Sequence, residues 1–422
     1  MFLTQSSVDY DLVILGGTAY ARAAALQAVG YGARVALVEP PGLFAQRQQQ
    51  NYLLKGLQQI GESLQRQAVG LQFGFKGDGA LDWQAVLGWS AIAAETQQDS
   101  LSVEAMSASG VDVVLEAPQR LTRRLMVETE SRRLGARGVL VACGEMPVAI
   151  EALRSAVLPR HVSVVGCSAE AVDWAWALSE CGVSVDLIAD EALPNEDADI
   201  RRLVRSLLIA SGICVCSEIG DNADTVLSLK PAKPVLELPK FVALKANCRM
   251  QMSQSRIFAC GSVLGGSTDE RLARYEADIA VRNALFLPVH TVDYSRSVRA
   301  SSLFASVGLS ETQAVRRYGR AVQIFSSSDA NAVCLRRESP LLRYCKLVCA
   351  DNRLVGAHLL RTDASDLIRA MASQIGMPVQ RLDAALLNAV GVGKEICRNA
   401  RWQPGRWRRD WAENWFNWQR NR

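Results

Sequence analysis

Two stretches of the chain share one pattern of apolar and polar positions. Asp11–Leu15 is a short apolar run, Ala19–Val29 is an alanine-rich segment, and Ala33–Glu39 is a second apolar run. Short apolar runs predict buried strands, and the longer alanine-rich segment predicts a helix. The pattern therefore predicts a strand, a turn, a helix and a second strand.

The same pattern returns near the middle of the chain. Val162–Val165 predicts a strand, a helix follows through Leu178, and Val183–Ile188 predicts the next strand. Further on, Cys345–Ala350 alternates like a strand, and an amphipathic helix is predicted from Asp363. We expect an α/β fold with two Rossmann-like three-layer domains and a C-terminal α+β domain.

The first predicted turn has the pattern of a dinucleotide-binding loop with one damaging change. It reads Gly-Gly-Thr-Ala-Tyr-Ala over residues 16–21, so the GxGxxG pattern becomes GxTxxA. Gly16 keeps the tight turn, but Thr18 stands where glycine lets the backbone approach a pyrophosphate. Phosphate binding should be weakened. Glu39 ends the second strand, where an acid accepts hydrogen bonds from a ribose; a solvent-exposed strand-end glutamate is the alternative.

The second turn is altered in a milder way. It keeps Gly166 but has Ser168 at the second glycine position, giving GxSxxA, a weak motif. Asp190 and Glu191 follow the next strand, and no arginine stands there for a 2′-phosphate. NADH is therefore favoured over NADPH if either binds.

These features, in this order, resemble the pyridine nucleotide-disulfide oxidoreductases, a family that includes dihydrolipoamide dehydrogenase and mercuric reductase. Ser301–Gln313 and Arg343–Gly376 are the closest matches, to the family's dimerisation domain. The resemblance implies FAD, a nicotinamide nucleotide and a homodimer. It also implies these parts: a FAD-binding domain (1–155 and 251–290), a truncated NAD(P)-binding-like domain (156–250), a dimerisation domain (291–400) and a Trp/Arg-rich tail (401–422).

The family's redox cysteines are missing. Counted from Glu39, the two positions of its C-x4-C pattern hold Arg47 and Tyr52, and the first cysteine of the chain is Cys143. Without thiols in that place, disulfide exchange has no chemical basis. The lysine that follows the pair in the family remains as Lys55.

Other positions carried over from the family are only partly kept. The resemblance pairs Lys55, beside the flavin, with Asp173 of the second nucleotide fold; ordinary surface residues are the alternative. The family's Ala-Thr-Gly turn corresponds to Ala-Cys143-Gly144, and its Gly-Asp, whose aspartate holds the ribityl chain, corresponds to Gly261-Ser262. The position of its acid-base histidine holds Val390.

Composition excludes several other classes of protein. No apolar run reaches eighteen residues, and the N-terminus lacks a basic region and cleavage site, so we expect a cytoplasmic protein. The eleven cysteines include no CxxC, and the three histidines have no neighbours at metal-ligand spacing. Reduced cysteines and no metal site are expected.

The last 22 residues carry the charge excess. The chain has a net charge of +4, and residues 401–422 hold six arginines against Asp410 and Glu413. Four tryptophans recur at helical spacing: Trp407, Trp411, Trp415 and Trp418. This pattern suits a membrane surface or a protein interface, and a helix packed on its own dimer is the alternative. Nucleic-acid binding is disfavoured, because the remainder offers no basic groove.

Two functions remain open. One is a flavin-dependent NAD(P)H oxidoreductase that lacks disulfide chemistry, with Glu39, Lys55, Asp173 and Gly144 as its motivation. The other is a non-catalytic dimeric scaffold that docks to a membrane or a protein complex through its tail. The losses at Thr18, Ser262 and Val390 favour the second.

Overall fold

The computed structural model describes residues 8–72, 81–96, 99–143, 149–154, 157–194, 196–220, 223–229, 245–264, 270–293, 298–300, 303–329, 343–361 and 364–392. The chain divides into two compact units. The first unit is Met1–Asn195 with Arg201–Asp293, and the second unit is Glu196–Ile200 with Tyr294–Arg422. Gly144 and the Trp/Arg-rich tail lie outside the described residues.

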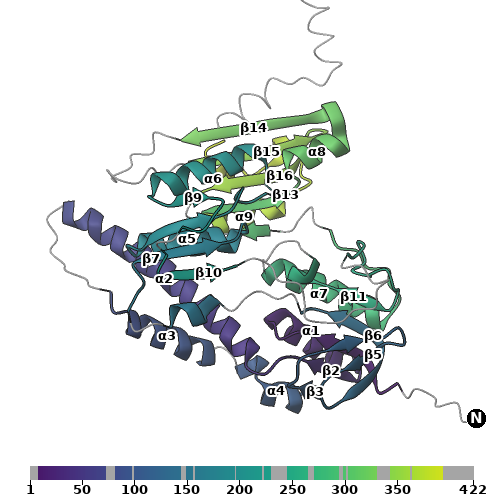
Figure 1. The fold of residues 1–422 in the computed structure, drawn as a ribbon. Helices are drawn as coiled ribbons and strands as arrows, with labels where there is room; N and C mark the ends of the chain where they lie inside the picture. Colours follow the sequence, from purple (N-terminus) through teal and green to yellow (C-terminus); the bar gives the residue numbers. More distant parts are fainter. Residues whose placement is uncertain are drawn as a thin grey trace, which may run out of the picture. The chain divides into compact units, whose positions relative to one another are not determined.

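The first unit contains a sheet whose described part has seven strands (Figure 1). The order is β3-β2-β1-β6-β5-β4, and β11 also pairs with β6. The strands β1, β2, β3, β6 and β11 run parallel, whereas β4 and β5 form an antiparallel extension. The bounds are β1 (Tyr10–Leu15), β2 (Val35–Val38), β3 (Val111–Val114), β4 (Arg120–Leu121), β5 (Met126–Glu128), β6 (Arg133–Val141) and β11 (Ile257–Ala259).

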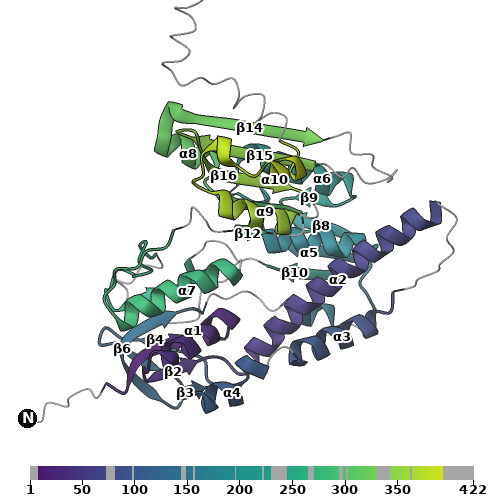
Figure 2. The ribbon, with the colours of Figure 1, turned by 180° about the vertical axis from the view of Figure 1, so that it is seen from behind.

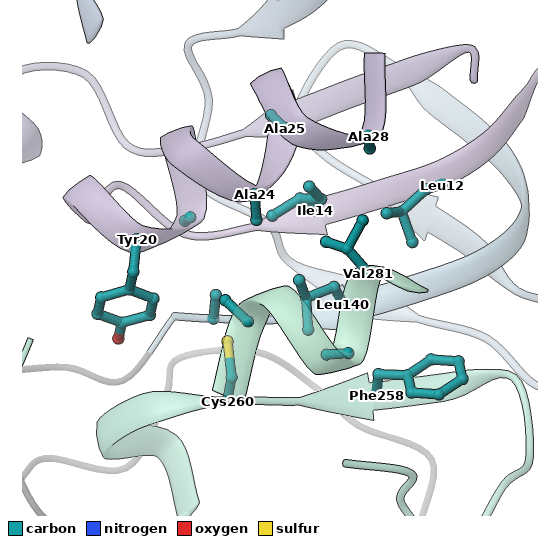
Figure 3. Packing of buried hydrophobic residues seen from close by; sticks show 14 of the residues in the cluster. Leu12, Ile14, Tyr20, Ala24, Ala25, Ala28, Leu140, Phe258, Cys260 and Val281 are labelled. Carbon is teal, nitrogen blue, oxygen red and sulfur yellow. The ribbon is translucent and has the colours of Figure 1, made fainter. Parts of the chain in front are cut away.

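One face of this sheet is covered by helices α1 (Ala19–Gly30) and α7 (Glu270–Leu285), which pack against each other. Figure 3 shows Ala24, Ala25 and Ala28 of α1 in this core, with side chains from β1 and β11 nearby. Small alanine side chains let a helix approach its neighbours closely, and burial on both sheet faces explains the continuous apolar run of β1.

The first unit also contains a four-stranded parallel sheet, ordered β10-β7-β8-β9 within the described residues. Helix α5 packs on β7 and β8, so this is the second strand-helix-strand repeat. The bounds are β7 (His161–Val165), α5 (Ala169–Glu180), β8 (Ser184–Ile188), β9 (Cys214–Cys216) and β10 (Thr225–Ser228). Helix α6 (Ala198–Ala210) belongs to this unit from Arg201 onward.

A long helix, α2 (Leu43–Gln72), packs along both α3 (Trp83–Thr96) and α5 (Figure 2). Its contacts connect the two nucleotide-type folds of the first unit. Shorter elements complete this unit: α4 (Val103–Ala108) and the 3-10 turns η1 (Asp99–Leu101), η2 (Ala149–Leu153) and η3 (Gly261–Leu264).

The second unit is built on an antiparallel sheet ordered β12-β13-β16-β15-β14. Helix α9 covers β13 and β16, and their apolar faces form a separate core. The bounds are β12 (Val298–Ala300), β13 (Phe304–Gly308), α8 (Glu311–Tyr318), η5 (Gly319–Ala321), β14 (Val322–Asp329), β15 (Arg343–Ala350), β16 (Arg353–Leu360), α9 (Ala364–Gln374), η6 (Val379–Arg381) and α10 (Ala384–Ala389).

The predicted α/β fold class is confirmed, and so are both strand-helix-strand repeats and the strand over residues 345–350. Parallel sheets of this kind require helical crossovers, and the alternation of short apolar runs with a helical segment indicated them. Among the described helices, none combines the length and apolar character needed to cross a membrane.

Candidate functional site

The first turn keeps the backbone geometry of a dinucleotide cradle. Gly16 follows β1 with a φ of +139°, a conformation that glycine adopts and other residues rarely do. A Cβ atom at Gly16 would lie 2.4 Å from the carbonyl oxygen of Ala142 at the end of β6. Glycine is therefore required here for two reasons, the backbone angle and the close approach of the next strand.

Thr18 is turned inward to cap α1. Its Oγ1 accepts a hydrogen bond from the backbone N–H of Ala21 at 3.2 Å, and the residue is only 6% exposed. The free N–H groups of a helix start are the groups that bind phosphate in this type of fold. The threonine hydroxyl thus occupies one donor that a pyrophosphate would use.

Tyr20, which the sequence analysis did not single out, fills space beside the same turn. Its side chain extends from the start of α1 (Figure 3), and a Cβ atom at Gly261 would lie 2.6 Å from its hydroxyl oxygen. Gly261, with a φ of +76°, donates its N–H to Glu276 at 2.8 Å. Burial raises the pKa of Tyr20 to about 12, so a neutral phenol stands between α1 and the end of β11.

Glu39, the expected ribose acceptor, is paired with an arginine. It is 1% exposed, and its two carboxylate oxygens accept from the Nε (3.1 Å) and Nη2 atoms of Arg22. The Arg22 guanidinium lies 3.8 Å from the ring centroid of Phe44 and donates to the carbonyl of Leu101 at 2.5 Å. The sequence did not indicate that Arg22 would pair with Glu39. The only signal was a charged residue within the largely apolar helix Ala19–Gly30.

The second turn has the same backbone form. Gly166 has a φ of +156°, and Ser168 caps α5 by accepting from the N–H of Ala171 at 3.3 Å. Glu170 lies in the first turn of α5 and accepts from Nε2 of Gln50 at 3.2 Å. Burial raises the pKa of Glu170. The Glu170 carboxyl group is therefore bonded to α2 beside the start of α5.

The residues carried over from the family's redox centre lie on α2 and α5. Lys55 is exposed, and its ammonium lies 4.9 Å from the ring centroid of Tyr52. Tyr52 also makes an edge-on contact with Trp89, at 6.5 Å between ring centroids. Asp173 is 9% exposed on α5. The pairing of Lys55 with Asp173 therefore stays a prediction.

The remaining predicted positions are spread over other elements. Cys143 and Ser262 are half-buried after β6 and in η3. Val390, at the end of α10, is 5% exposed in the apolar core of the second unit. In the part of the chain that the structure describes, no three His, Cys, Asp or Glu side chains are placed to hold a metal ion.

The family model of the pyridine nucleotide-disulphide oxidoreductases matches residues 10–220, and the chain belongs to this family. The resemblance found in the sequence is thereby confirmed. The chain is 24% identical to the dihydrolipoyl dehydrogenase of Chlorobaculum tepidum, over 86% of this chain and 90% of that protein. It is 25% identical to a dihydrolipoyl dehydrogenase of Bacillus subtilis, again over 86% of this chain and 90% of that protein. It is 22% identical to the mercuric reductase of Staphylococcus aureus, over 89% of this chain and 79% of that protein.

The family is FAD-dependent and uses pyridine nucleotides, so FAD is the cofactor that the first cradle would hold. A residue that binds a cofactor must present its polar atoms toward it. Here Thr18, Tyr20, Arg22 and Glu39 are 6%, 7%, 5% and 1% exposed, and Glu39 is bonded to Arg22. Among the described residues of this cradle, the Glu39 carboxylate is bonded to Arg22 through both oxygens, an arrangement that is closed to the ribose of FAD.

Proposed function

We propose that this chain is a non-catalytic member of the family that acts as a dimeric scaffold. The observation that carries the proposal is the buried ion pair between Arg22 and Glu39, which occupies the carboxylate needed for the ribose. The capping of α1 by Thr18 and the packing of Tyr20 against Gly261 also support a cradle that does not bind the cofactor. In this proposal the three arrangements together account for a first cradle that does not retain FAD.

The absence of thiols on α2 supports this proposal. Arg47 and Tyr52 stand at the positions of the redox pair, and Tyr52 is in contact with Lys55 and Trp89. Burial raises the pKa values of Cys181, to about 11, and of Cys349, to about 12, which disfavours their reactive thiolate forms. Disulfide exchange has no thiolate in the place where the family uses one.

A second candidate is an NAD(P)H-flavin oxidoreductase that holds its flavin in a shifted pose. The observation that favours it is that Gly16 and Gly166 both keep the positive φ angles of dinucleotide turns. In the second nucleotide fold, Glu191 is bonded to Arg201 at 3.0 Å, so the positive charge of Arg201 is neutralised. This pair gives a 2′-phosphate little attraction and agrees with a preference for NADH over NADPH.

The two candidates are separated by a flavin titration. We expect the purified protein to be colourless and added FAD to remain free in equilibrium dialysis, because the polar groups of the first cradle are bonded to one another. The visible absorption spectrum is then recorded before and after anaerobic NADH and NADPH. Stoichiometric flavin that bleaches with either nucleotide would overturn the scaffold proposal and establish the second candidate.

The scaffold would meet its partners through two regions. We propose that the second unit forms the homodimer, as the resemblance implies, and that the tail docks to a membrane surface or a protein complex. A tryptophan stripe with arginines around it combines apolar area with positive charge, which suits an anionic headgroup layer or an interface hot spot.

Deletion of residues 404–422 should release the protein from its partner. We expect the full chain to sediment with membranes or elute as a large complex, and the truncated chain to do neither. A matched variant that changes Trp407, Trp411, Trp415 and Trp418 to serine keeps all the arginines, so it separates apolar contact from charge. Unchanged sedimentation and elution of the truncated chain would count against tail docking, whereas the flavin titration tests the cradle independently.

A further inference from the structure

A cavity of about 600 Å³ opens at the edge of the first sheet opposite the dinucleotide turns. The turns follow the carboxyl ends of the parallel strands, whereas this cavity is lined by residues near their amino ends. Asp11 lies early in β1, Ala33 precedes β2, and Arg256 precedes β11. Its volume falls within the range of about 300–1,000 Å³ that is typical of small-molecule sites.

The charged groups in and beside this cavity leave an excess of positive charge. Arg137 of β6 and Arg256 line it, and Arg34 lies next to it in sequence after Ala33. Asp11 is shared, since it lies 3.6 Å from Arg137 and 3.8 Å from Arg34. Among the described residues Arg256 has no acidic partner. The cavity lining thus holds two guanidinium groups and one carboxylate, and Arg34 outside the lining draws on that same carboxylate, so an anion would complete the charge balance.

Apolar and aromatic side chains also line the cavity. Tyr31 and Phe286 form an edge-to-face pair with ring centroids 5.4 Å apart, yet they remain 45% and 58% exposed. Leu125 also lines the cavity and has a φ of +58°, a left-handed conformation that leucine rarely adopts. Strained residues of this kind cost about 1–3 kcal/mol and gather at binding and catalytic sites.

We propose that this cavity binds a small organic anion, a carboxylate or phosphate monoester carried on a flat aromatic group. The anion would lie between Arg137 and Arg256, where planar guanidinium groups bind oxyanions in a bidentate manner. The ring would lie against Tyr31 and Phe286, where its burial removes apolar surface from water. This site is separate from both dinucleotide turns and does not depend on the proposed scaffold function.

Ligand-observed fluorine NMR on the full chain tests the proposal with two probes, 4-fluorophenyl phosphate and 4-fluorobenzoate. We expect at least one probe to bind the unmodified chain and R137Q/R256Q to weaken that binding about tenfold or more, because two charge-assisted contacts are lost. Arg137 is 64% exposed, so its replacement should leave the fold intact. The matched control R316Q/R320Q removes the same charge from exposed positions near α8 and should change the affinity by less than about twofold.

Further outcomes decide each part of the proposal. If neither probe binds the unmodified chain at millimolar concentration, or if both double variants weaken binding equally, no anion site exists at this cavity. The variant F286A should weaken the aromatic probes about fivefold and leave competition by inorganic phosphate unchanged. Equal competition by inorganic phosphate and phenyl phosphate would overturn the aromatic part. The relative affinities of the two probes show whether phosphate or carboxylate is preferred.

Discussion

Replacing Lys346 with methionine is expected to lower the free energy of unfolding of the second unit by about 3 kcal/mol. The Lys346 side chain is 2% exposed, and its Nζ atom lies 3.1 Å from Asp197, 3.0 Å from Asp199 and 2.8 Å from Glu311. Asp197 is itself almost fully buried, so removing the ammonium leaves an uncompensated buried charge. Asp199 and Glu311 are 28% and 45% exposed and should add less, because water screens them.

The same cluster predicts how this stability depends on pH. Burial alone would raise the pKa of Asp197, but the backbone N–H of Glu311 and the Lys346 ammonium lower it overall. For Asp199 burial is likewise outweighed, by Tyr344 and Lys346. A carboxyl group with a depressed folded-state pKa contributes stability above its unfolded pKa, near 3.9, and loses it as pH falls through the folded value. Without the Lys346 ammonium, the pKa values of Asp197 and Asp199 are lowered less. The difference in unfolding free energy between K346M and the unmodified chain should therefore shrink below about pH 4.

Urea-dependent hydrogen exchange of the β15 and β16 amides measures this effect within the second unit. The matched control is R369M, since Arg369 is 58% exposed and pairs with Asp366, which is 88% exposed. This control should change stability by less than about 0.5 kcal/mol. A K346M deficit of the same small size, or one that does not change with pH, would show that the buried cluster is not what holds these strands.

Replacing Arg22 with methionine should cost the first unit about 3 kcal/mol, because Glu39 would be left buried without its cation. Arg22 also bonds to Leu101 and covers Phe44, so part of the loss comes from packing. The double variant R22M/E39L removes both charges and should recover a large share of the stability.

Urea-dependent exchange of the β1 and β2 amides gives the free energies for this double-mutant cycle. R133M is the matched control, because Arg133 is 79% exposed and its pairing with Glu128 should contribute little. If R22M is as stable as the control, the Arg22–Glu39 pair is not a fixed part of the fold. The carboxylate of Glu39 would then be available to a ribose, which would favour FAD binding and contradict the scaffold proposal.

Local sequence patterns were sufficient for the strand-helix-strand repeats and for one strand of the second unit. The apolar runs of β1 and β7, the helical segments of α1 and α5 and the alternation in β15 all appear where their periodicity indicated them. The turn glycines Gly16 and Gly166 were also recognised, and both have the positive φ angles that such turns require. These features depend on residues that are close together in the sequence, so they can be predicted from the sequence directly.

The candidate site was only partly predictable. The sequence placed Thr18 and Glu39 at the first cradle and suggested weakened phosphate binding. It did not indicate that Arg22 would meet Glu39, 17 residues away, or that Tyr20 would pack against Gly261. Lys346 likewise meets Asp197 across 149 residues, and neither was singled out.

The sequence by itself therefore determined the family, the fold class and the absence of any cysteine before Cys143, because each depends only on residue types and their spacing along the chain. Only the tertiary structure decided which polar groups are paired with one another and which face a cavity. The physical reason is that sheet order and helix packing bring together side chains from distant parts of the chain. Burial then fixes their charges and their hydrogen bonds.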